Sequence, residues 1–342
     1  MKAVRFHEHG APDVLRYEEA PDPVLAPGEV LVRVHACALN HLDLWARHGL
    51  PNVRIAMPHI TGSDVAGEVI ESAATGVALG RRVMLHPGLS CGRCEACLTG
   101  RDNQCPAYEV LGYTGHDGGY AQLVKVPAAN LIEIPDEIDF VRAAAFPLTF
   151  LTAWHMLMAR AGLQRGEDVL VLAAGSGVGQ AAIQIAVLHG ARVIATAGSD
   201  EKLARARALG AAETIDHYKQ DIAEEIKRLT NRRGVDVVIE HVGEATWPQS
   251  VRSLARGGRL VTCGATTGRR GTLDLAAVFA KQLSIQGSYM GTKGELLRVA
   301  RHFFAGELSP VIDGTFPLAE AAAAHRRLAD SEQFGKIVLL VQ

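Results

Sequence analysis

The sequence has no long hydrophobic run and almost no excess of charge of either sign. No stretch of roughly eighteen apolar residues is uninterrupted, and the best candidate, 169–187, is broken by glycine and glutamine. The formal net charge of −2 over 342 residues gives no electrostatic reason to expect nucleic acid or an anionic membrane surface as a partner. The opening MKAVRFHEHG lacks the apolar core and small-residue cleavage site of a secretory signal. We therefore expect a cytoplasmic protein with no nucleic-acid or membrane partner.

Cysteine is also infrequent, and four of the six cysteines are clustered. Six cysteines in a chain of this length do not suggest a disulfide scaffold. Four of them lie in the segment CGRCEACLTGRDNQC, separated by two, two and seven residues: Cys91, Cys94, Cys97 and Cys105. Four thiolates at such short spacing suit a closed tetrahedral zinc site, which holds structure and leaves no open position for chemistry. An iron–sulfur cluster on the same ligands is the alternative. We predict one structural zinc per chain.

The pattern of predicted secondary structure changes at about residue 146. Before it, short strand-like runs are separated by frequent Pro-Gly, Gly-Gly and Asp-Gly turns. From residue 168 onward, β-branched runs such as DVLVLAA and ARVIATA alternate with amphipathic helical stretches. That alternation is typical of βαβ units on a parallel sheet, so we predict an α/β domain preceded by a mainly β domain.

A glycine-rich turn follows the first predicted strand of the parallel sheet. The strand 168–173 leads into AAGSGVGQAA, and a helix follows at once. The predicted cofactor contacts in this turn are Gly175, Ser176, Gly177, Val178 and Gly179. Glycine lets the backbone approach a pyrophosphate, and the helix N-terminus offers N–H groups and a positive dipole. No register gives the full G-x-G-x-x-G spacing, so an ordinary glycine-rich turn stays open as the alternative.

The end of the next strand bears on the choice of cofactor. An NAD site places an acidic residue there to bind the ribose 2′-hydroxyl, but this strand ends at Ala197 and continues into glycine and serine. Ser199 and Lys202 offer a hydroxyl donor and a positive charge to a 2′-phosphate. We therefore expect NADPH rather than NADH, with Lys202 as an ordinary solvated lysine the alternative.

Together these features resemble the medium-chain dehydrogenase/reductase superfamily over essentially the whole chain. The cysteine lobe is similar to that of zinc alcohol dehydrogenases, whereas RVHACALNHLD, ITGSDVAGEV, AAAFPLTFLTAW, ATAGSDEK and IQGSYMGT are similar to quinone oxidoreductases. The resemblance implies a GroES-like catalytic domain (1–149) with a structural zinc lobe at about 88–108. It also implies a Rossmann doubly wound parallel-sheet domain (150–289) and a C-terminal completion of the catalytic domain (290–342), with the active site in the cleft between the two domains.

The same resemblance lets the catalytic zinc site of alcohol dehydrogenases be tested position by position. The positions of its three ligands are held here by Asn40, Ser63 and Leu148. An amide, a hydroxyl and a leucine cannot hold zinc in competition with water, so we expect no catalytic zinc. A site improvised from nearby side chains is the alternative, and its candidate ligands are His41, Asp43, His59 and Asp64.

Without a catalytic zinc, the reduction of a quinone or an α,β-unsaturated carbonyl compound is the chemistry that fits. Such a reduction spreads negative charge over a phenolate or enolate, which hydrogen bonds can stabilise, whereas a simple ketone leaves a strongly basic alkoxide. Asn40 is the candidate donor to the substrate carbonyl, and Asp43 and Ser63 orient it or pass on a proton. Asp43 as a simple helix cap is the alternative. Two other functions stay open: a zinc-type alcohol or aldehyde dehydrogenase, and a non-enzymatic NADPH-binding protein.

The resemblance also implies further cofactor contacts and a symmetric assembly. The residues expected near the nicotinamide are Thr152, Val242, Gly243, Gly264, Ala265, Ser288 and Met290. The last strand of the Rossmann sheet, near 283–289, is expected to be an open apolar edge that pairs with its symmetry mate. We therefore predict a homodimer, or a tetramer built from it.

Overall fold

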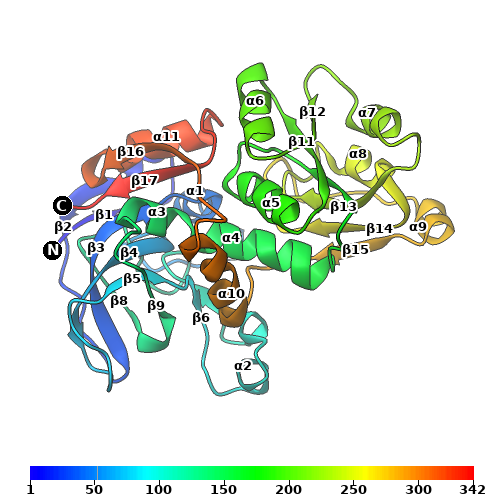
Figure 1. Ribbon diagram of the computed structural model, residues 1–342. Helices are drawn as coiled ribbons and strands as arrows, with labels where there is room; N and C mark the ends of the chain where they lie inside the picture. Colours follow the sequence, from blue (N-terminus) through cyan, green and yellow to red (C-terminus); the bar gives the residue numbers. More distant parts are fainter. Residues whose placement is uncertain (52) are drawn as a thin grey trace. The chain divides into compact units, whose positions relative to one another are not determined.

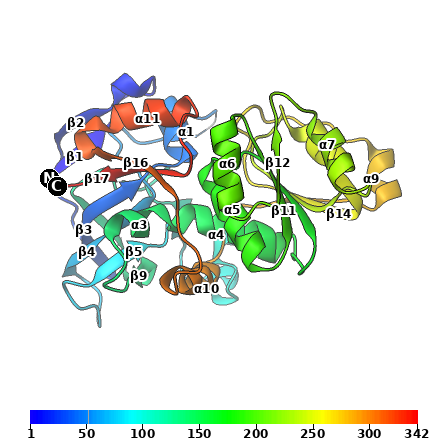
Figure 2. The same cartoon turned by 45° about the horizontal axis from the view of Figure 1, so that its top comes forward.

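The chain leaves its first structural unit after residue 148 and returns to it at residue 292. The computed structural model describes residues 1–51 and 53–342. Unit 1 comprises Met1–Leu148 and Thr292–Gln342, and unit 2 comprises Thr149–Gly291. Both chain ends lie side by side in unit 1 (Figures 1 and 2). The side chain of Gln122 connects them, because it accepts the N–H of Lys2 at 2.8 Å and donates to the carbonyl of Gln342 at 2.8 Å.

Unit 1 is built around a seven-stranded, mostly antiparallel sheet. The strands run in the order β16-β17-β3-β4-β5-β9, with β8 also paired to β3. Their bounds are β3 (Glu29–Ala38), β4 (Asp64–Ser72), β5 (Arg82–Leu85), β8 (Leu123–Pro127), β9 (Leu131–Glu133), β16 (Ile312–Pro317) and β17 (Lys336–Leu340). Two smaller antiparallel pairs are β1 (Lys2–Arg5) with β2 (Arg16–Glu19), and β6 (Gly88–Leu89) with β7 (Glu109–Val110). Because β17 pairs with β3, the C-terminal strand completes a sheet that the N-terminal strands began.

Three helices of unit 1, α1 (His41–His48), α3 (Phe140–Ala145) and α10 (Lys293–Phe304), begin with polar side chains that accept N–H groups of the first turn. The unit also contains α2 (Glu95–Leu98) and α11 (Ala321–Ala329), with 3-10 turns at η1 (Pro12–Val14), η2 (Asp102–Gln104), η3 (Ala128–Asn130) and η5 (Leu318–Glu320). At the start of α10, Thr292 and Glu295 form a reciprocal capping box. At the start of α1, the carboxylate of Asp43 accepts the N–H of Asn40 at 2.7 Å. Helix α4 (Pro147–Trp154) contains the boundary between the units and continues into the π-helical turn η4 (His155–Arg160).

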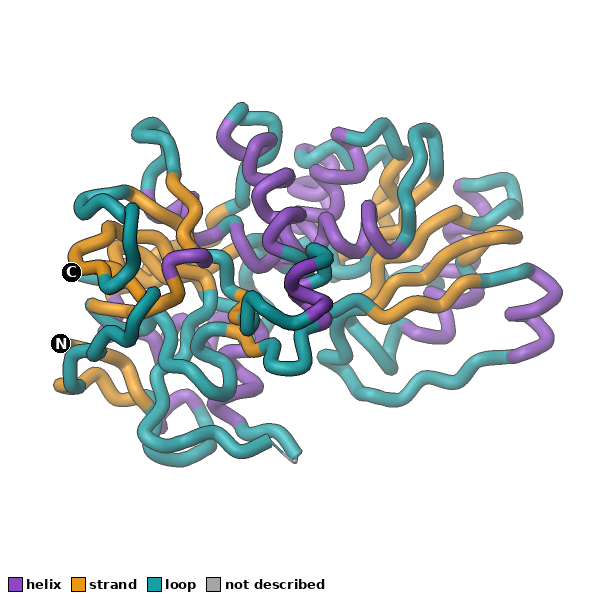
Figure 3. Tube along the Cα trace, turned by 90° about the horizontal axis from the view of Figure 1, so that it is seen from below, coloured by secondary structure: helices purple, strands orange, loops and turns teal. Residues whose placement is uncertain are grey.

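Unit 2 is a doubly wound parallel sheet. Its six strands lie in the order β12-β11-β10-β13-β14-β15, and every neighbouring pair is parallel. The strands are β10 (Asp168–Val171), β11 (Arg192–Ala197), β12 (Glu213–Asp216), β13 (Val235–Glu240), β14 (Leu254–Thr262) and β15 (Ser284–Gly287). The connecting helices are α5 (Gly177–Leu188), α6 (Asp200–Ala208), α7 (Ile222–Leu229), α8 (Trp247–Arg252) and α9 (Leu275–Lys281). Helices lie on both faces of the sheet (Figures 1 and 3), so the predicted α/β fold is confirmed.

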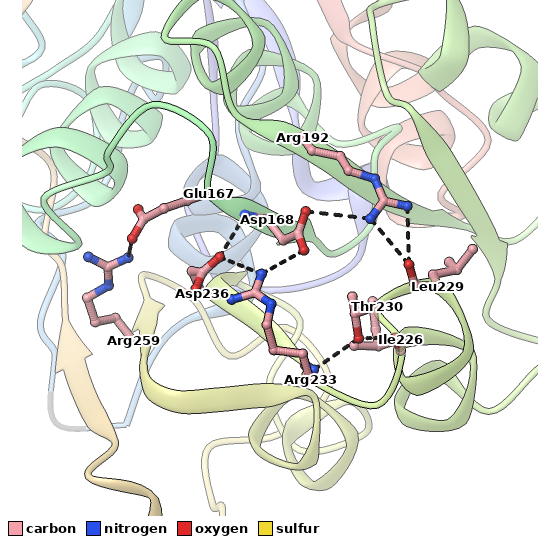
Figure 4. Close-up of polar contacts among 10 residues, drawn as sticks. Glu167, Asp168, Arg192, Ile226, Leu229, Thr230, Arg233, Asp236 and Arg259 are labelled. Carbon is pink, nitrogen blue, oxygen red and sulfur yellow. Dashed lines mark hydrogen bonds and ion pairs between the residues drawn. The ribbon is translucent and has the colours of Figure 1, made fainter.

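Ion pairs hold the amino ends of the central strands of unit 2. Arg233 lies between two carboxylates, with its guanidinium nitrogens 2.7 Å from Asp168 and 2.6 Å from Asp236 (Figure 4). Asp236 also accepts the N–H of Asp168 at 2.8 Å, which connects the first residue of β10 to β13. In a parallel sheet the ligand site lies at the carboxyl ends of the strands, so we interpret this cluster as structural.

Apolar side chains of the strands fill the interior of each unit. All four residues of β10 are buried, as expected for a central strand covered on both faces. In unit 1 the buried valines of β3 and β4 pack with residues of β17 and α11. Within the described residues, none of the helices is both long and apolar enough to span a bilayer.

Candidate functional site

The four clustered cysteines of unit 1 converge on one point. Their sulfur atoms all lie within 4.8 Å of one another. The Sγ atom of Cys97 is 3.9 Å from that of Cys91 and 3.5 Å from that of Cys94. Tetrahedral zinc with Zn–S bonds of about 2.3 Å needs sulfur atoms roughly 3.8 Å apart, so the observed arrangement fits a zinc ion held by four thiolates. The cluster leaves no position for a substrate, which suits a structural metal.

The cysteine lobe is also connected to the helix at which the chain returns to unit 1. The carboxylate of Asp102, in the turn before Cys105, accepts the N–H of Lys293 at 3.2 Å from each oxygen. An acceptor there satisfies one of the free N–H groups in the first turn of α10 and favours its dipole. In Figures 1 and 2, α10 lies beside the lobe that contains α2. The metal lobe therefore supports the second crossing into unit 1.

A second polar cluster of unit 1 is centred on a buried lysine. The ammonium group of Lys336, at the start of β17, donates to the carbonyl of Leu39 at 2.7 Å, to Oδ1 of Asn40 at 2.6 Å and to Oδ2 of Asp64 at 2.9 Å. The amide of Asn40 donates in turn to the same oxygen of Asp64 at 2.9 Å. The other oxygen of Asp64 accepts the N–H of Leu148 at 2.8 Å. A fully hydrogen-bonded ion pair is thus buried at the end of β3.

This second cluster does not fit a zinc ion. Of the three family ligand positions, Leu148 has an apolar side chain, and the hydroxyl of Ser63 donates to the carbonyl of Leu111 at 2.6 Å. The oxygen of Asn40 already accepts from the ammonium of Lys336, whose positive charge repels a metal cation. His59 instead approaches Asp117, with 3.6 Å between Nδ1 and Oδ1. Over residues 1–51 and 53–342, metal-ligand side chains converge in a group of three or more only at the four cysteines.

The carboxylate of Asp43 connects α1 to the segment before β4 by hydrogen bonds. Its side chain is fully buried and accepts the N–H of Asn40 at 2.7 Å, the hydroxyl of Thr61 at 2.7 Å and the N–H of Gly62 at 3.1 Å. The hydroxyl of Tyr120 lies 3.5 Å from Oδ2. Burial raises the pKa of the Asp43 carboxyl to about 6, against the lowering effect of these hydrogen bonds.

Gly62 explains how these residues approach one another. Its φ of 109° suits glycine, and a Cβ atom there would lie 2.5 Å from the ring of Tyr120 and 2.8 Å from the sulfur of Cys37. The absence of a side chain lets the segment that carries Ser63 and Asp64 pack against Tyr120. The structure thus places Asn40, Asp43 and Ser63 in one buried region of unit 1.

Sequence reasoning missed the lysine at the centre of this region. Lys336 is 296 residues from Asn40 along the chain, and GKIVLLV gives no local motif that sets its lysine apart from a solvated one. The contact follows from the pairing of β17 with β3, which places the two strand ends together. A parallel argument applies to Tyr120 and His325, whose polar atoms are 3.1 Å apart. An apolar strand that begins with lysine at the chain's end was the only signal.

The glycine-rich turn of unit 2 has the geometry of a dinucleotide-binding turn. Ser176 caps α5, with its Oγ accepting the N–H of Gly179 at 2.8 Å. A Cβ atom on Gly179 would lie 2.3 Å from the carbonyl oxygen of Ala173, so only glycine allows the helix to begin this close to β10. Gly175, Gly177 and Val178 complete the turn at the N-terminus of a twelve-residue helix. Its first N–H groups and positive dipole suit a pyrophosphate.

The predicted 2′-phosphate contacts lie at the start of α6. Strand β11 ends at Ala197, and the hydroxyl of Ser199 caps the helix by accepting the N–H of Lys202 at 3.3 Å. An accepting hydroxyl keeps its own proton, so Ser199 can still donate to an outside anion. Asp200 opens the first turn, where its carboxylate is 3.5 Å from Lys219.

A buried carboxylate shapes the turn after β13. Oε1 of Glu240 accepts the N–H groups of Val242 at 2.7 Å and Gly243 at 3.0 Å, and Oε2 accepts the hydroxyls of Thr246 and Ser250 at 2.9 and 2.6 Å. These two backbone amides are therefore occupied, and the carbonyls of Val242 and Gly243 also accept hydrogen bonds, from Thr267 and from Thr246 and Trp247. The other predicted contacts of unit 2 are Thr152, buried in α4; Gly264 and Ala265, after β14; and Ser288 and Met290, after β15.

Comparison with known proteins identifies the family. Residues 26–136 match the alcohol dehydrogenase GroES-like domain, and residues 177–305 match the zinc-binding dehydrogenase domain. Quinone oxidoreductase from Homo sapiens is 30% identical over 353 residues, covering 100% of this chain and 98% of that protein. The chain belongs to the medium-chain dehydrogenase/reductase superfamily. Unit 1 has the GroES-like fold of this superfamily, and unit 2 has its Rossmann fold.

Both quinone oxidoreductases and alcohol dehydrogenases are similar to this protein. Quinone oxidoreductase from Pseudomonas aeruginosa is 34% identical over 350 residues, covering 99% of each chain. A crystal structure of an NAD-dependent alcohol dehydrogenase has a TM-score of 0.96 and 48% identity, and the match covers 100% of both chains. The protein is accordingly an oxidoreductase of small molecules that uses a nicotinamide cofactor and zinc.

Proposed function

We propose that this protein is an NADPH-dependent reductase of quinones or α,β-unsaturated carbonyl compounds, with a structural zinc and no catalytic zinc. The observation that carries the proposal is the Lys336–Asp64 ion pair beside Asn40, where zinc-dependent relatives need metal ligands. An ammonium group within a hydrogen bond of the first ligand position is incompatible with a metal ion there. The reaction must then proceed without a Lewis acid in this region.

The amide of Asn40 is the group best suited to the substrate carbonyl. It is 7% exposed, whereas Asp43 and Ser63 are fully buried, so Asn40 alone of the three can reach an outside molecule. One N–H of the amide donates to Asp64 at 2.9 Å, and its second contact is a long one of 3.5 Å to the carbonyl of Ala38. That second N–H is the donor we assign to the oxygen of a quinone or enone. Asp43 and Ser63 are positioning residues in this proposal.

The nearby charges favour an acceptor whose product anion is delocalised. When bound, the nicotinamide supplies the hydride. The charge that then develops on the acceptor oxygen meets a neutral amide N–H, which is polarised by the ammonium of Lys336 on the amide oxygen at 2.6 Å. A single charge-polarised donor stabilises a phenolate or enolate more readily than a localised alkoxide.

The cofactor assignment depends on the start of α6. Ser199 and Lys202 offer a donor and a positive charge to a 2′-phosphate, and β11 ends without an acidic residue. A second candidate function is an NAD-dependent alcohol dehydrogenase, because the 48% identical structure carries that name. The two differ in both cofactor and substrate.

A substrate and cofactor panel on the purified zinc-loaded protein separates the candidates. Turnover is measured with NADPH and NADH against benzoquinones, conjugated enones and saturated aldehydes, and in reverse with simple alcohols. We expect fast quinone or enone reduction with NADPH and tighter binding of NADPH than of NADH. In Lys202→Ala the difference between the two cofactor affinities is expected to be smaller. Robust alcohol oxidation with NAD would establish the second candidate, and NADPH binding without turnover of any acceptor would indicate a non-enzymatic protein.

We also propose that β15 forms the interface of a homodimer. It is one of the two outer strands of the unit 2 sheet, and the adjoining helix α9 exposes Leu275 and Phe279 at 72% and 74%. Pairing two such edges satisfies their free backbone groups and covers apolar surface. Light scattering is expected to give twice the mass of 36.5 kDa, and a monodisperse monomer contradicts the proposal.

A further inference from the structure

Arg47 of α1 is a buried cation without a direct counter-ion. Its side chain has no exposed surface. It donates from Nη1 to Nδ1 of His325 at 3.4 Å and from Nη2 to Nε2 of His48 at 3.2 Å, and its Nε has no partner. Within the described part of the chain, no carboxylate lies in ion-pair distance of this guanidinium. A buried charge is unfavourable unless an opposite charge or aligned hydrogen bonds compensate it, so its stabilisation needs an explanation.

Asp43, one helical turn earlier on α1, presents the opposite case. It is a fully buried carboxylate, and over residues 1–51 and 53–342 no cation lies in ion-pair distance of it. Its partners are two backbone N–H groups and the hydroxyls of Thr61 and Tyr120. The ammonium of Lys336 lowers the pKa of Asp43 from beyond hydrogen-bond distance, whereas the carboxylate of Asp64 raises it. The two buried charges of α1 are therefore each incompletely compensated locally.

Two buried side chains connect these charges. The hydroxyl of Tyr120 lies 3.5 Å from Oδ2 of Asp43 and 3.1 Å from Nε2 of His325, and Nδ1 of His325 faces Arg47 at 3.4 Å. The rings of Tyr120 and His325 are perpendicular, with centroids 5.6 Å apart. Burial and the charge of Arg47 lower the pKa of His325 to about 3, so its imidazole is neutral. We refer to Arg47, His325, Tyr120 and Asp43 as the donor chain.

The direction of every hydrogen bond in the donor chain is fixed by its end at Arg47. A guanidinium only donates, so Nδ1 of the neutral His325 must accept. The proton of the imidazole is then on Nε2, which donates to the oxygen of Tyr120. The hydroxyl proton of Tyr120 is left to point at Asp43. All the dipoles align with the negative end toward the cation and the positive end toward the carboxylate, although the individual contacts are long.

We propose that Arg47 is the remote counter-charge of Asp43 and, through it, a positioning residue for Asn40. The aligned imidazole and phenol carry the influence of the guanidinium to a carboxylate that it does not touch. An ionised Asp43 accepts from both Asn40 and Gly62, and this holds the start of α1 against the segment that carries Ser63. Protonation of Asp43 converts one acceptor to a donor and loosens that connection.

The charged and titratable groups that face the donor chain define what else influences it. Facing Asp43 are Asp64 on β4, Lys336 on β17 and the thiol of Cys37 on β3. The groups that face the other end are His48, the neighbour of Arg47 on α1, together with Arg326 on α11 and Asp13 on η1. Arg326 is half exposed and paired with Asp13 at 2.7 Å, so its charge is screened by solvent and by a partner.

The pKa of Asp43, measured by carbon-13 NMR on the full chain labelled at aspartate Cγ, tests the proposal. Asp43→Asn assigns the signal. Tyr120→Phe, His325→Leu and Arg47→Met each remove one link, and each is expected to raise the pKa of Asp43 by about one unit, because a donor to the charged form or a favourable charge is lost. At the original midpoint the ionised fraction then falls from one half to about a tenth. Arg47→Lys keeps the positive charge, so it is expected to raise the pKa of Asp43 by less than Arg47→Met does.

Arg326→Met is the matched control, since it removes an exposed guanidinium from the same neighbourhood. We expect it to leave the pKa of Asp43 within about 0.3 unit of the original. If Arg47→Met does not fold, Tyr120→Phe decides, because it removes a single hydroxyl and keeps the ring against Gly62. An unchanged pKa of Asp43 in Tyr120→Phe, or an equal shift in Arg326→Met, overturns the proposal.

The positioning role rests on the proposed function and has its own readout. In Tyr120→Phe, the acid limb of the kcat profile for quinone reduction is expected to move to higher pH by the same amount as the pKa of Asp43, with KM for NADPH unchanged. If the pKa of Asp43 shifts but the kcat profile does not move, the positioning role is overturned, and the role of Arg47 as a counter-charge of Asp43 is still supported. A shifted pKa in a protein that reduces no quinone or enone contradicts the proposed function alone.

Discussion

Unit 1 contains two clusters at the positions where the resemblance to zinc alcohol dehydrogenases implies metal sites, and their charges are compensated in opposite ways. At the first, four thiolates lie within 4.8 Å of one another and require a cation from outside the protein. At the second, one carboxylate, Asp64, is compensated by the chain's own cation, Lys336, at 2.9 Å. On the function proposed above, the second cluster binds no metal, because the ammonium of Lys336 already compensates its carboxylate.

The two clusters also differ in how the sequence encodes them. The cysteines span residues 91–105, so a single loop brings them together. The second cluster draws on the residues just after β3 and on β4, α4 and β17, and these three strands meet only when the sheet of unit 1 is complete. A local cluster can form as soon as its metal binds, whereas the distributed cluster depends on the whole unit.

The largest expected effect comes from breaking the first cluster. Cys94→Ser removes one thiolate, and we expect loss of zinc and a fall of roughly 5 kcal/mol or more in the free energy of unfolding, since a structural zinc contributes directly to folding. Elemental analysis of the unmodified protein is expected to give one zinc per chain. Cys263→Ser, outside the cluster, is the control and retains the metal. Two zinc ions per chain in the unmodified protein would contradict the assignment of the second cluster as metal-free.

Breaking the second cluster is expected to have the next largest effect. Lys336→Met leaves Asp64 as a buried carboxylate without its cation, which costs about 3–5 kcal/mol of unfolding free energy. Lys336→Met combined with Asp64→Asn removes both charges and is expected to recover much of that loss in urea denaturation. The control is Lys219→Met, because Lys219 is an exposed partner of Asp216 and its loss costs about 1 kcal/mol or less. Equal losses in the two lysine variants would show that the ion pair is not effectively buried.

The catalytic significance of the second cluster is tested by Asn40→Ala. If its N–H reaches the acceptor oxygen, kcat is expected to fall by an amount equivalent to at most about 2.7–4 kcal/mol, while NADPH affinity stays nearly unchanged. A smaller loss follows where water substitutes for the amide. Steady-state quinone reduction and a cofactor titration measure the two quantities separately. An unchanged kcat would show that Asn40 takes no part in the chemistry and serves only as a structural partner of Lys336.

The residues that could be predicted from the sequence are those whose role is local. The thiolate spacing, the βαβ alternation of unit 2 and the glycine turn before α5 each depend on neighbours within a few residues. Val242 and Gly243 were placed correctly after a strand, but the side chain of Glu240 occupies their N–H groups, and no spacing rule predicts the conformation of that carboxylate. Asn40 could be singled out as a replaced ligand, but its partner Lys336 could not, because strand pairing over nearly 300 residues brought them together.

The smallest expected effect is the pH dependence of stability from the donor chain, where the shifted pKa values of Asp43 and His325 act in opposite directions. Burial raises the pKa of Asp43 from 3.8 to about 6, so between these values the folded state holds more protons than the unfolded state, and stability falls as pH rises. The pKa of His325 is lowered from 6.5 to about 3, so the folded state holds fewer protons in that window, and stability rises with pH. Between about pH 4 and 6 the two contributions oppose each other and nearly cancel. Each is at most about 1.4 kcal/mol per pH unit.

Removing one of these two groups exposes the other. In Asp43→Asn, the free energy of unfolding is expected to rise more steeply with pH between 4 and 6 than in the unmodified protein. In His325→Leu it is expected to rise less steeply, or to fall. Urea denaturation at several pH values measures both slopes, and the cysteine cluster contributes equally to all three proteins provided zinc stays bound. Parallel slopes in the three proteins would mean that neither group is held away from its ordinary pKa, and the donor chain would then be as accessible to water as a surface site.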